Sequence, residues 1–502
     1  MKKIGVFINK YADYLVIFVL DAIGMILELV AARLMTPYFG NSNFVWTAII
    51  GIILLAGALG NIIGGKISSL KLSRFLACVL LLFAAIYIAV TPLIEYDVLK
   101  PIGEWEAGIQ VASVVGSIIF FLIPSTILGI IPPIVMKEKI GPSKDQGKES
   151  GRITAVIALG SLLGTFAGGF WLIPVMGTKV IFVLIAICIT ILTPLFQPLK
   201  NNKNRNLTLF LIFIWIVAFI TSVASFITLK NLNINSAGIS IDTEYGRIMV
   251  VDDIRGGDAV RYYKQSGAYS SATYTDKELR NELVFDYMKK YDEMFEFRDV
   301  NNVAMIGGAA YQYPKYYISH FPKKRMDVIE IDPKATEIAK KYFFLDELLA
   351  EYGEDRLGLY NEDGRLFLAN SDTKYDAILN DAFSGEVPVG EIATVEAAKI
   401  IKDSLSENGV YMSNVLGAVS GSKGKFLRAE VKTLKQVFKK VYVASVYNRP
   451  KKDAYINWMV IATDNTDYVP SKLVDIDITD EDIILTDDYN PVDSLVTTEY
   501  FD

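Results

Sequence analysis

Residues 302–333 read NVAMIGGAAYQYPKYYISHFPKKRMDVIEIDP, and this stretch indicates how the second half of the chain folds. Its first part, NVAMIGG (302–308), is an apolar run that ends in two glycines, as a buried strand does where it turns into a helix. Its last part, VIEIDP (328–333), is a second apolar run that ends in acidic residues. Two buried strands joined by a helix are typical of a parallel sheet.

Strand-like and helix-like segments continue to alternate downstream. Helices are expected at 333–344, 394–406 and near 423–438. Further strands are expected within RLGLYNEDG (356–364), YDAILNDAF (375–383) and GVYMSNV (409–415), with VYVASVY and INWMVIAT closing the sheet. This alternation predicts an α/β fold with a mostly parallel sheet wound on both faces. Ligands of such sheets bind at the carboxyl ends of the strands, near the topological switch point.

Upstream of this sheet the pattern changes twice. Short strands around a Gly256-Gly257 turn predict a small β hairpin region that begins near residue 239. The segment TDKELRNELVFDYMKKYDEMFE, which starts at Thr275, predicts a helix at 276–296.

Glycines and carboxylates gather at the expected strand ends. They are Gly307 and Gly308, then Glu330 and Asp332, then Asp363 and Gly364. Glycines at such a turn let the backbone approach a nucleotide, and a carboxylate at the second strand's end can accept hydrogen bonds from ribose hydroxyls. Each carboxylate taken alone is more simply a helix N-cap or a solvated loop residue. As a set they favour a nucleoside site. The spacing also fits a dinucleotide unit, and the third acidic position favours an adenosyl sulfonium.

The composition divides the 502 residues into two unlike halves. Residues 1–230 hold 18 of the 50 basic and 10 of the 56 acidic residues, and the remainder is strongly acidic. This split excludes a single soluble domain, a disordered chain and a collagen-like chain. It also argues against a nucleic-acid partner, because phosphate binding needs basic patches.

The first half contains apolar runs long enough to cross a bilayer, which needs about 20 residues. The seven candidate spans are 14–36, 44–65, 75–94, 109–136, 153–176, 179–198 and 207–229. We therefore expect a multi-pass membrane helical domain at 1–230, a linker at 231–238, the small β region with its helix at 239–300, and the sheet domain at 301–502. The first span is too long for a cleaved signal peptide and has no small-residue cleavage site after it.

Three charged residues interrupt the first span. Asp21 and Glu28 are seven residues apart and share a helix face, and Arg33 follows at the span's end. Charges at membrane depth usually face a bundle interior or a water path. Both a route for a cation or amine and an internal ion pair between helices fit this pattern.

Small residues and prolines mark two other spans. Gly160, Gly164 and Gly168 in span five, like Gly60 and Gly64 in span two, have the spacing that lets helices approach closely. Prolines at 124, 132 and 133 are expected to distort span four.

The basic loops also predict an orientation. Lys2, Lys3 and Lys10 share one side with the basic loops after spans two, four and six, so this side is expected to be cytoplasmic. Seven crossings then place the acidic half outside the cell. Adenosyl sulfonium donors are cytosolic, so charge and chemistry disagree, and one miscounted span at four or five would reverse the result.

Cysteine and histidine are too scarce for several chemistries. Cys78 and Cys188 both lie in apolar runs, which excludes a disulfide framework and a cysteine-rich zinc site. The single histidine, His320, leaves no multi-histidine metal site and no Ser-His-Asp chemistry. No metal and no prosthetic group are expected.

Several sequence words, in order along the chain, resemble the polyamine aminopropyltransferase family, and the whole chain resembles its membrane-fused spermidine synthase-like members. They are PYFGNSNFVWTAIIG (37–51), EYGRIMVVDD (244–253), IGGAAYQYPKYY (306–317), VIEIDP (328–333), NEDGRLFL (361–368), YDAILNDAFSGEVP (375–388) and LTDDYNP (485–491). The resemblance implies a class I methyltransferase-like sheet that binds decarboxylated S-adenosylmethionine.

The resemblance also implies roles for individual residues. Glu330 matches the residue that binds the ribose hydroxyls, Asp363 the residue near the adenine amine, and Gly307 and Gly308 the start of the glycine loop. Asp381 matches the first aspartate of the motif after strand four, beside the sulfonium. The implied reaction moves an aminopropyl group to putrescine and yields spermidine and methylthioadenosine.

The chain departs from the family at the amine side of the site. GGAAY (307–311) stands where soluble members have GGGDG, and Ser384 stands where they have the second motif aspartate. FDYM (285–288) is at best a distant form of a Tyr-His-Glu-Met-like element. Asp381, Glu386 or Asp286 are candidates to replace the missing carboxylate. Tyr262, with Tyr263 and Tyr311, is a candidate to line an amine pocket by cation–π contact.

Three functions follow as expectations. The first is a membrane-bound aminopropyltransferase of polyamine biosynthesis that uses decarboxylated S-adenosylmethionine. The second is a degenerate synthase-like domain coupled to polyamine binding, sensing or transport by the helices. The third is a methyltransferase that uses S-adenosylmethionine. The expected partners are a polyamine such as putrescine or spermidine, a lipid bilayer and a second copy of the chain. Asp487 and Asp488 either close the pocket mouth or form an Asx turn.

Overall fold

The computed structural model describes residues 2–496 except 41, 104, 106, 107, 142, 144, 197–204, 236, 237, 298, 385, 386, 446, 449 and 468; side chains of residues 2–10, 174, 230–235 and 384 are also outside the description. Contacts between Cα atoms divide the chain into two units. Unit 1 comprises Met1–Ser236 with Ile241–Gly246, and unit 2 comprises Ala237–Ser240 with Arg247–Asp502.

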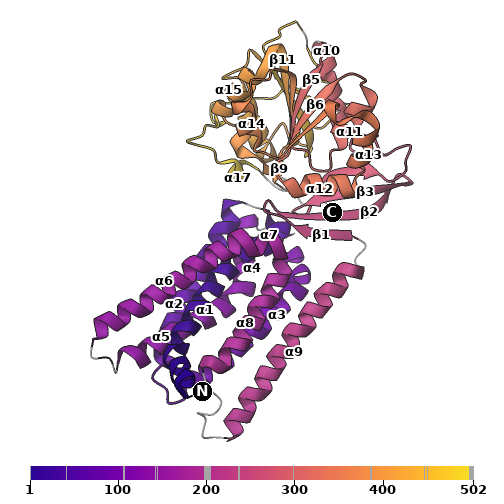
Figure 1. Ribbon diagram of the computed structural model, residues 1–502. Coiled ribbons are helices and arrows are strands. Elements are labelled where there is room, and N and C mark those ends of the chain that lie inside the picture. The colour runs from indigo at the N-terminus through magenta and orange to yellow at the C-terminus, as the bar shows by residue number, and fades with distance from the viewer. Residues whose placement is uncertain are drawn as a thin grey trace. The chain divides into compact units, whose positions relative to one another are not determined.

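Unit 1 is a bundle of long apolar helices (Figure 1). Its elements are α1 (Lys2–Phe39), α2 (Asn43–Ile67), α3 (Ser73–Gly103), α4 (Ile109–Ser117), η1 (Ile118–Leu122), α5 (Ile123–Ile140), α6 (Gln146–Ala167), η2 (Gly168–Leu172), α7 (Ile173–Met176), α8 (Thr178–Phe196) and α9 (Arg205–Asn235). Within the described residues, seven helical segments are long and apolar enough to cross a membrane, which confirms the expected seven spans. Helix α9 continues into the residues expected to form the linker.

Spans four and five are irregular but continuous. Each contains a π-helical turn, η1 or η2, that directly precedes an Ile-Pro pair and leads into the next α-helical segment. A proline in a helix removes one backbone hydrogen bond, and a π-turn is a common way to accommodate such a break. The spans therefore continue past these prolines with a local change of helix type.

The spaced glycines let helix backbones touch. A Cβ atom on Gly60 or Gly64 of α2 would lie 2.4 Å from a backbone oxygen of α5, at Thr126 or Ile130. Gly160 and Gly164 of α6 meet the backbone of α1 in the same way, with such an atom 2.3 Å from an oxygen of Phe18 or Ala22. The expectation that these glycines serve helix packing is confirmed.

Buried ion pairs lie near the ends of the helices. Asp13 pairs with Arg74 at 2.9 Å and with Lys139 at 2.8 Å, and Glu95 pairs with Lys179 at 2.8 Å. Arg33 donates a hydrogen bond to the backbone oxygen of Glu244. In the part of the chain that is described, Asp21 and Glu28 form no ion pair, so the expected ion pair between helices is not seen at these residues.

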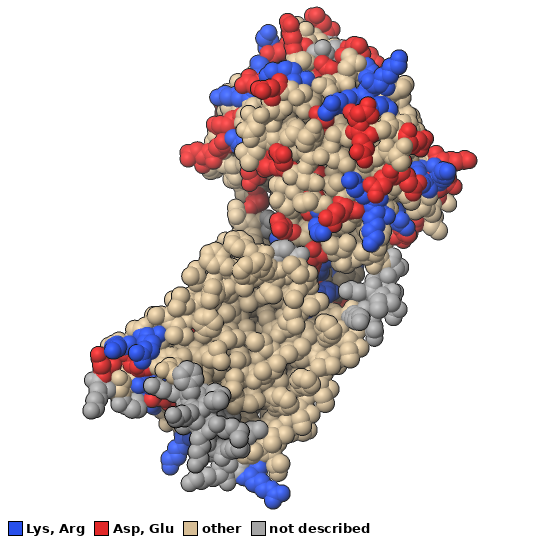
Figure 2. All heavy atoms as spheres, in the orientation of Figure 1, with Lys and Arg blue, Asp and Glu red and all other residues tan. Residues whose placement is uncertain are grey.

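Charge separates the two units (Figure 2). On the face shown, acidic and basic side chains cover unit 2 densely, whereas the middle of the bundle is bare of them. Large side chains that point outward from α6 and η2 include Leu159, Leu163, Phe170 and Trp171. An apolar belt of this kind is the surface that a bilayer covers.

A four-stranded sheet in the order β1-β2-β3-β4 precedes the main sheet, and its strands β2, β3 and β4 pair antiparallel. Its strands are β1 (Gly238–Asp242), β2 (Arg247–Arg255), β3 (Asp258–Gln265) and β4 (Ala268–Tyr274). Gly256 and Gly257 make the β2–β3 turn with φ values of 63° and 101°, which glycine adopts without steric cost. The expected β hairpin region is therefore present.

The helix expected at 276–296 is wrong. Turns lead to a 3-10 helix, η4 (Asp286–Glu293), and one short α-helix, α10 (Met294–Phe297). The physical reason is that neighbouring apolar residues face different cores. Val284 packs with Val260 and Tyr262 of the small sheet, whereas Leu283 and Met288 belong to the core of the large sheet. Tertiary packing therefore overrides the local helix signal in this segment.

The main sheet has seven strands in the order β12-β13-β11-β8-β5-β6-β7. They are β5 (Asn302–Ile306), β6 (Arg325–Ile329), β7 (Leu357–Tyr360), β8 (Tyr375–Asn380), β11 (Leu405–Gly417), β12 (Lys440–Ser445) and β13 (Ile456–Thr463). Strand β13 runs antiparallel to β11 and β12, and the other neighbours are parallel. The order reverses between β5 and β8, which makes this the topological switch point.

Helices cover both faces of this sheet (Figure 1). They are α11 (Gln312–His320), α12 (Pro333–Tyr342), α13 (Leu345–Tyr352), α14 (Gly364–Asn370), α15 (Val395–Ser404) and α16 (Lys425–Leu434). Alternate residues of β5 enter two cores, with Val303 and Met305 on one face and Ala304 and Ile306 on the other. The fold is a class I methyltransferase-like α/β sheet preceded by a helical bundle, as expected.

The adjacent glycines 64 and 65 give a matched test of bundle packing. We expect Gly64→Ala to lower the stability of the detergent-solubilised protein by about 1–3 kcal/mol, because the new methyl group overpacks a backbone contact. Gly65→Ala is the control, since nothing lies within 4 Å of the position of its Cβ atom. Melting temperatures of the two variants test this, and equal values would contradict the packing interpretation.

Candidate active site

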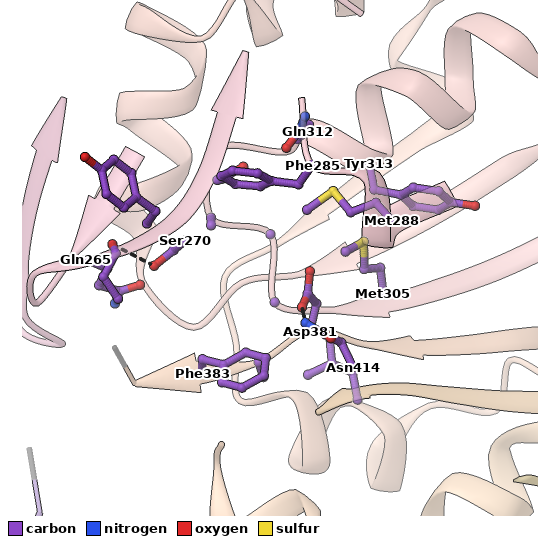
Figure 3. A pocket seen from close by; sticks show the side chains of 18 of the residues that line it. Gln265, Ser270, Phe285, Met288, Met305, Gln312, Tyr313, Asp381, Phe383 and Asn414 are labelled. Atoms are coloured by element: carbon purple, nitrogen blue, oxygen red, sulfur yellow. Dashed lines mark hydrogen bonds between the residues drawn. The ribbon is translucent and has the colours of Figure 1, made fainter. Parts of the chain in front are cut away.

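A cavity of about 420 Å³ opens at the carboxyl ends of the central strands of unit 2 (Figure 3). Its floor comes from residues that follow β5, β6 and β8, and β3, β4 and the segment 285–288 form a second wall. This volume is within the usual range for small-molecule sites, and the cavity lies at the switch point where ligands of such sheets bind.

The turn after β5 requires its first glycine. Gly307 has φ of 90°, and a Cβ atom there would lie 2.6 Å from the backbone oxygen of Asp381. The turn continues through Ala309 and Tyr311, whose φ values of 44° and 57° are in the left-handed region that glycine favours. The chain thus keeps a glycine-type loop conformation at two positions where it has other residues.

Glu330, at the end of β6, holds this turn. Its Oε2 atom accepts hydrogen bonds from the backbone N–H groups of Gly308 at 2.9 Å and Ala309 at 2.8 Å, and Oε1 accepts from Asp332 N–H at 3.0 Å. Burial raises the pKa of this carboxyl group, and the three N–H groups oppose that shift. A carboxylate has about four acceptor positions, so room remains for one more donor.

The other two acidic positions differ from each other. Asp363 lines the cavity and also caps α14 by accepting from the N–H of Leu366 at 2.9 Å. Asp332 is buried, caps α12 through the N–H of Lys334 at 2.9 Å, and is not among the residues that line the cavity. Gly364 lines the cavity beside Asp363.

Asp381, just after β8, is at the centre of a polar network in the cavity (Figure 3). Tyr287 Oη donates to its Oδ2 at 2.9 Å, and Asn414 Nδ2 donates to its Oδ1 at 2.8 Å. Asn457 Nδ2 in turn donates to Asn414 Oδ1 at 3.0 Å. Burial raises the pKa of Asp381 to about 6, and the two neutral donors limit the rise. A carboxylate with such a pKa can accept a proton near neutral pH.

The remaining candidates are dispersed. Asp286 lines the cavity and pairs with Lys289 at 3.0 Å on the protein surface. Tyr262 is not a lining residue; its ring packs edge-on against Tyr269 with the centroids 5.0 Å apart. Glu386 and the side chain of Ser384 lie outside the described residues.

Two tyrosines considered for an amine pocket are core residues. Tyr263 is fully buried against Phe343, and Tyr311 is fully buried with its hydroxyl group 2.8 Å from Thr336 Oγ1. Neither lines the cavity.

Asp487 also lies away from the cavity. It forms an ion pair with Arg365 at 2.5 Å and accepts a hydrogen bond from Thr394 Oγ1 at 2.8 Å. Asp488 is likewise not a lining residue.

Within the residues that the structure describes, neither the histidine nor a group of possible metal ligands forms a second functional site. His320 stacks on Tyr316 with ring centroids 4.2 Å apart and does not line the cavity. Across the described part of the chain, no three His, Cys, Asp or Glu side chains converge as a metal site would require.

Sequence reasoning missed the partners of Asp381. Tyr287 lies within the FDYM segment, and Asn414 is a polar residue in the apolar strand GVYMSNV. The available signal for Asn414 was a polar side chain inside an otherwise apolar strand. Such a residue indicates a hydrogen-bond partner, because buried polar groups are normally hydrogen-bonded. No local pattern indicated that these two residues meet Asp381.

Comparisons with known proteins find similarity in the part of the chain that forms the cavity. Residues 271–470 match the sequence model of a family described as "Spermine/spermidine synthase domain". A polyamine aminopropyltransferase of Vibrio vulnificus (strain CMCP6) is 29% identical over 143 residues, which are 28% of this chain and 44% of that protein. One from Hydrogenobaculum sp. (strain Y04AAS1) is 26% identical over 136 residues, which are 26% of this chain and 47% of that protein. The chain thus spans about half the length of these relatives.

Solved structures give distant similarities. A probable spermidine synthase from Corynebacterium glutamicum ATCC 13032 has a TM-score of 0.40 at 19% identity and covers 46% of this chain and 82% of its own. Spermidine synthase from Thermotoga maritima has a TM-score of 0.35 at 17% identity and covers 49% and 81%. Residues 271–470 thus match a spermine/spermidine synthase domain, the family that the resemblance implied.

The strained turn gives a stability test. We expect Ala309→Gly to stabilise the protein by up to about 1 kcal/mol, because glycine adopts a positive φ without the steric cost that alanine meets. Ala310→Gly is the neighbouring control. Its φ is not positive, so it loses a buried methyl group and gains chain entropy in the unfolded state. A lower melting temperature for both variants would contradict the interpretation that the backbone is strained at Ala309.

Proposed function

We propose that unit 2 transfers an aminopropyl group from decarboxylated S-adenosylmethionine to an amine such as putrescine, yielding spermidine and methylthioadenosine. The observation that carries this proposal is the position of Asp381, with a raised pKa, in one cavity with Glu330 and Asp363. The family match over residues 271–470 supports it.

Donor binding would use the strand ends. Glu330 would accept a hydrogen bond from one ribose hydroxyl group with its remaining acceptor position, and Asp363 would accept from the adenine amine. Gly307 and Gly308 keep side chains out of the space beside the nucleoside, since both line the cavity. Carboxylates also stabilise a sulfonium cation and an amine acceptor.

The transfer is a single displacement. The lone pair of the acceptor amine attacks the methylene carbon next to the sulfonium sulfur, a C–N bond forms, and the C–S bond breaks. The sulfur keeps the electron pair and becomes the thioether of methylthioadenosine. The new ammonium loses a proton, which Asp381 would accept while Tyr287 and Asn414 hold its carboxylate in place.

The pH dependence tests the role of Asp381. Its raised pKa means that the carboxyl group is protonated and unable to accept a proton below about 6. We therefore expect kcat/KM to rise with pH up to about 6 and then level off. Asp381→Asn should lower kcat by about 10²–10⁴-fold, the usual range for a lost general base.

The control for this variant is Asp372→Asn, an exposed residue just before β8 and outside the cavity. Rates come from methylthioadenosine release in detergent. Unchanged turnover in Asp381→Asn would remove Asp381 from the mechanism. Absence of both turnover and methylthioadenosine binding in the unmutated protein would overturn the proposed function.

We further propose that the bundle anchors this domain in the cell membrane with unit 2 in the cytoplasm, where adenosyl donors are made. Seven spans and the basic loops argue for the opposite side, so the point needs a direct measurement. Ser422 is exposed in unit 2 and is a suitable labelling position.

The labelling experiment uses Ser422→Cys in a background with Cys78→Ala and Cys188→Ala. We expect a membrane-impermeant maleimide to label the introduced cysteine only after lysis. Labelling in intact cells would place unit 2 outside and would deprive the synthase of its donor. The cysteine-free background, which retains Ser422, controls for labelling at other groups. An outward domain would favour polyamine binding or transport instead.

A further inference from the structure

Lys315, in α11, is a fully buried lysine that the proposed transfer does not use. Its Nζ atom donates three hydrogen bonds: to Thr273 Oγ1 at 2.8 Å, to the backbone oxygen of Phe343 at 2.9 Å and to that of Arg280 at 3.1 Å. The hydroxyl hydrogen of Thr273 is itself donated to the Arg280 oxygen at 2.9 Å, so each of the three acceptors takes a hydrogen from Lys315. Only the ammonium form of lysine has three hydrogens to donate.

This ammonium group is held by neutral oxygens. Burial and the nearby charge of Arg280 lower the pKa of Lys315 to about 7, and the charge of Glu347 opposes that shift. Glu347 forms its own ion pair with Arg280. The carbonyl group of Phe343 lies at the C-terminal end of α12, where the helix dipole favours a cation. At about pH 6.5 the ammonium form therefore still predominates, and its three hydrogen bonds are complete.

The three acceptors belong to three different elements. Thr273 is in β4, Arg280 is in the segment that follows β4, and Phe343 ends α12. Helix α11, which carries Lys315, follows the turn after β5, and α12 follows the end of β6. One nitrogen atom therefore joins the second wall of the cavity to the two helices that continue from its floor.

The contact between α11 and β4 differs at its two ends. Gln312 is three residues before Lys315 on the same face of α11, and Ser271 is two residues before Thr273 on the same face of β4. Both line the cavity, and they are 2% and 1% exposed, yet neither side chain has a hydrogen-bond partner. Among the described residues, the hydrogen bond from Lys315 to Thr273 is thus the one polar contact between α11 and β4.

We propose that Lys315 is a positioning residue for donor binding, because it holds β4 at the distance from Glu330 and Gly308 that the nucleoside requires. The inference rests on the proposed function and adds a residue that does not itself line the cavity. The nucleoside would lie between the floor at the ends of β5 and β6 and the wall that contains β4. A wall that is not held in place would contact the nucleoside less closely and bind it more weakly.

The groups around Asp381 are held independently of this contact. Tyr287, which donates to Asp381, lies between Leu283 and Met288, and both of these side chains pack in the core of the main sheet. Asn414 reaches Asp381 from β11 of the same sheet. Loss of the Lys315 contact should therefore weaken donor binding and leave the transfer step nearly unchanged.

Two variants remove the contact from opposite sides. Lys315→Met keeps the length of the side chain but donates no hydrogen bond, and Thr273→Val keeps the shape of threonine without its hydroxyl group. We expect the donor KM and the Kd of methylthioadenosine to rise about 10-fold in the first and about 3-fold in the second, with kcat within about twofold, because only binding loses an interaction. Both constants are measured on the full chain in detergent at about pH 6.5, where the ammonium form predominates.

Hydrogen–deuterium exchange gives a second readout that needs no turnover. We expect the amides of residues 268–274 to exchange faster in both variants, whereas those of β5 and β8 should keep their rates. Thr433→Val in α16 is the matched control. Thr433 is also fully buried, donates to the Ala429 oxygen at 2.7 Å and accepts from Leu485 N–H at 2.9 Å, but lies outside the cavity. It should lower the melting temperature without changing KM or the exchange of residues 268–274.

The outcomes for the inference and for the proposed function are distinct. Unchanged KM, Kd and exchange in the two variants would overturn the positioning role and leave the aminopropyl transfer intact. A lower kcat at constant KM would also overturn it, because a smaller folded fraction has that effect, and so would an equal rise of KM in Thr433→Val. Weaker methylthioadenosine binding and faster exchange in a protein without aminopropyl transfer would support the positioning role and overturn the proposed function. If Lys315→Met does not fold, Thr273→Val decides by the same criteria.

Discussion

The carboxylate of Glu330 organises the site of unit 2. By accepting from the N–H groups of Gly308 and Ala309 it joins the turn after β5 to the end of β6. The same turn approaches the Asp381 backbone through Gly307, where no side chain fits. The ends of β5, β6 and β8 are therefore held at one point, and the cavity exists because the chain leaves the sheet there in opposite directions. A substitution of Glu330 would disturb the turn as well as any ribose contact.

The partners of Asp381 decide which chemistry its carboxyl group can support. Asp381 has neutral partners, Tyr287 and Asn414, so burial dominates and its pKa lies near 6. An arginine or lysine in their place would hold the carboxylate permanently ionised, with a weaker tendency to take up a proton. This carboxyl group is thus suited to accept a proton near neutral pH.

The bundle of unit 1 depends on a different constraint. Glycines of α2 and α6 let their backbones contact α5 and α1, and this close approach is the packing typical of apolar helices that associate without polar contacts. The π-turns before the two Ile-Pro pairs keep spans four and five continuous. The number of candidate spans is odd because of that continuity.

The sequence by itself determined the class of each half. Seven apolar runs and the alternation of strands and helices are local, periodic signals, so the bundle and the α/β sheet were both predicted from them. Glycines and carboxylates after strands β5, β6, β7 and β8 were visible for the same reason, since strand ends of a parallel sheet meet at one edge. Only the tertiary structure decided which of them line the cavity, with Asp363 inside it and Asp332 used as a helix cap. It also broke the helix expected at 276–296, because Leu283 and Val284 bury against different cores, and it brought Tyr287, Asn414 and Gln312 to the site from distant segments. Such meetings depend on packing between elements far apart in the chain, and no local pattern records them.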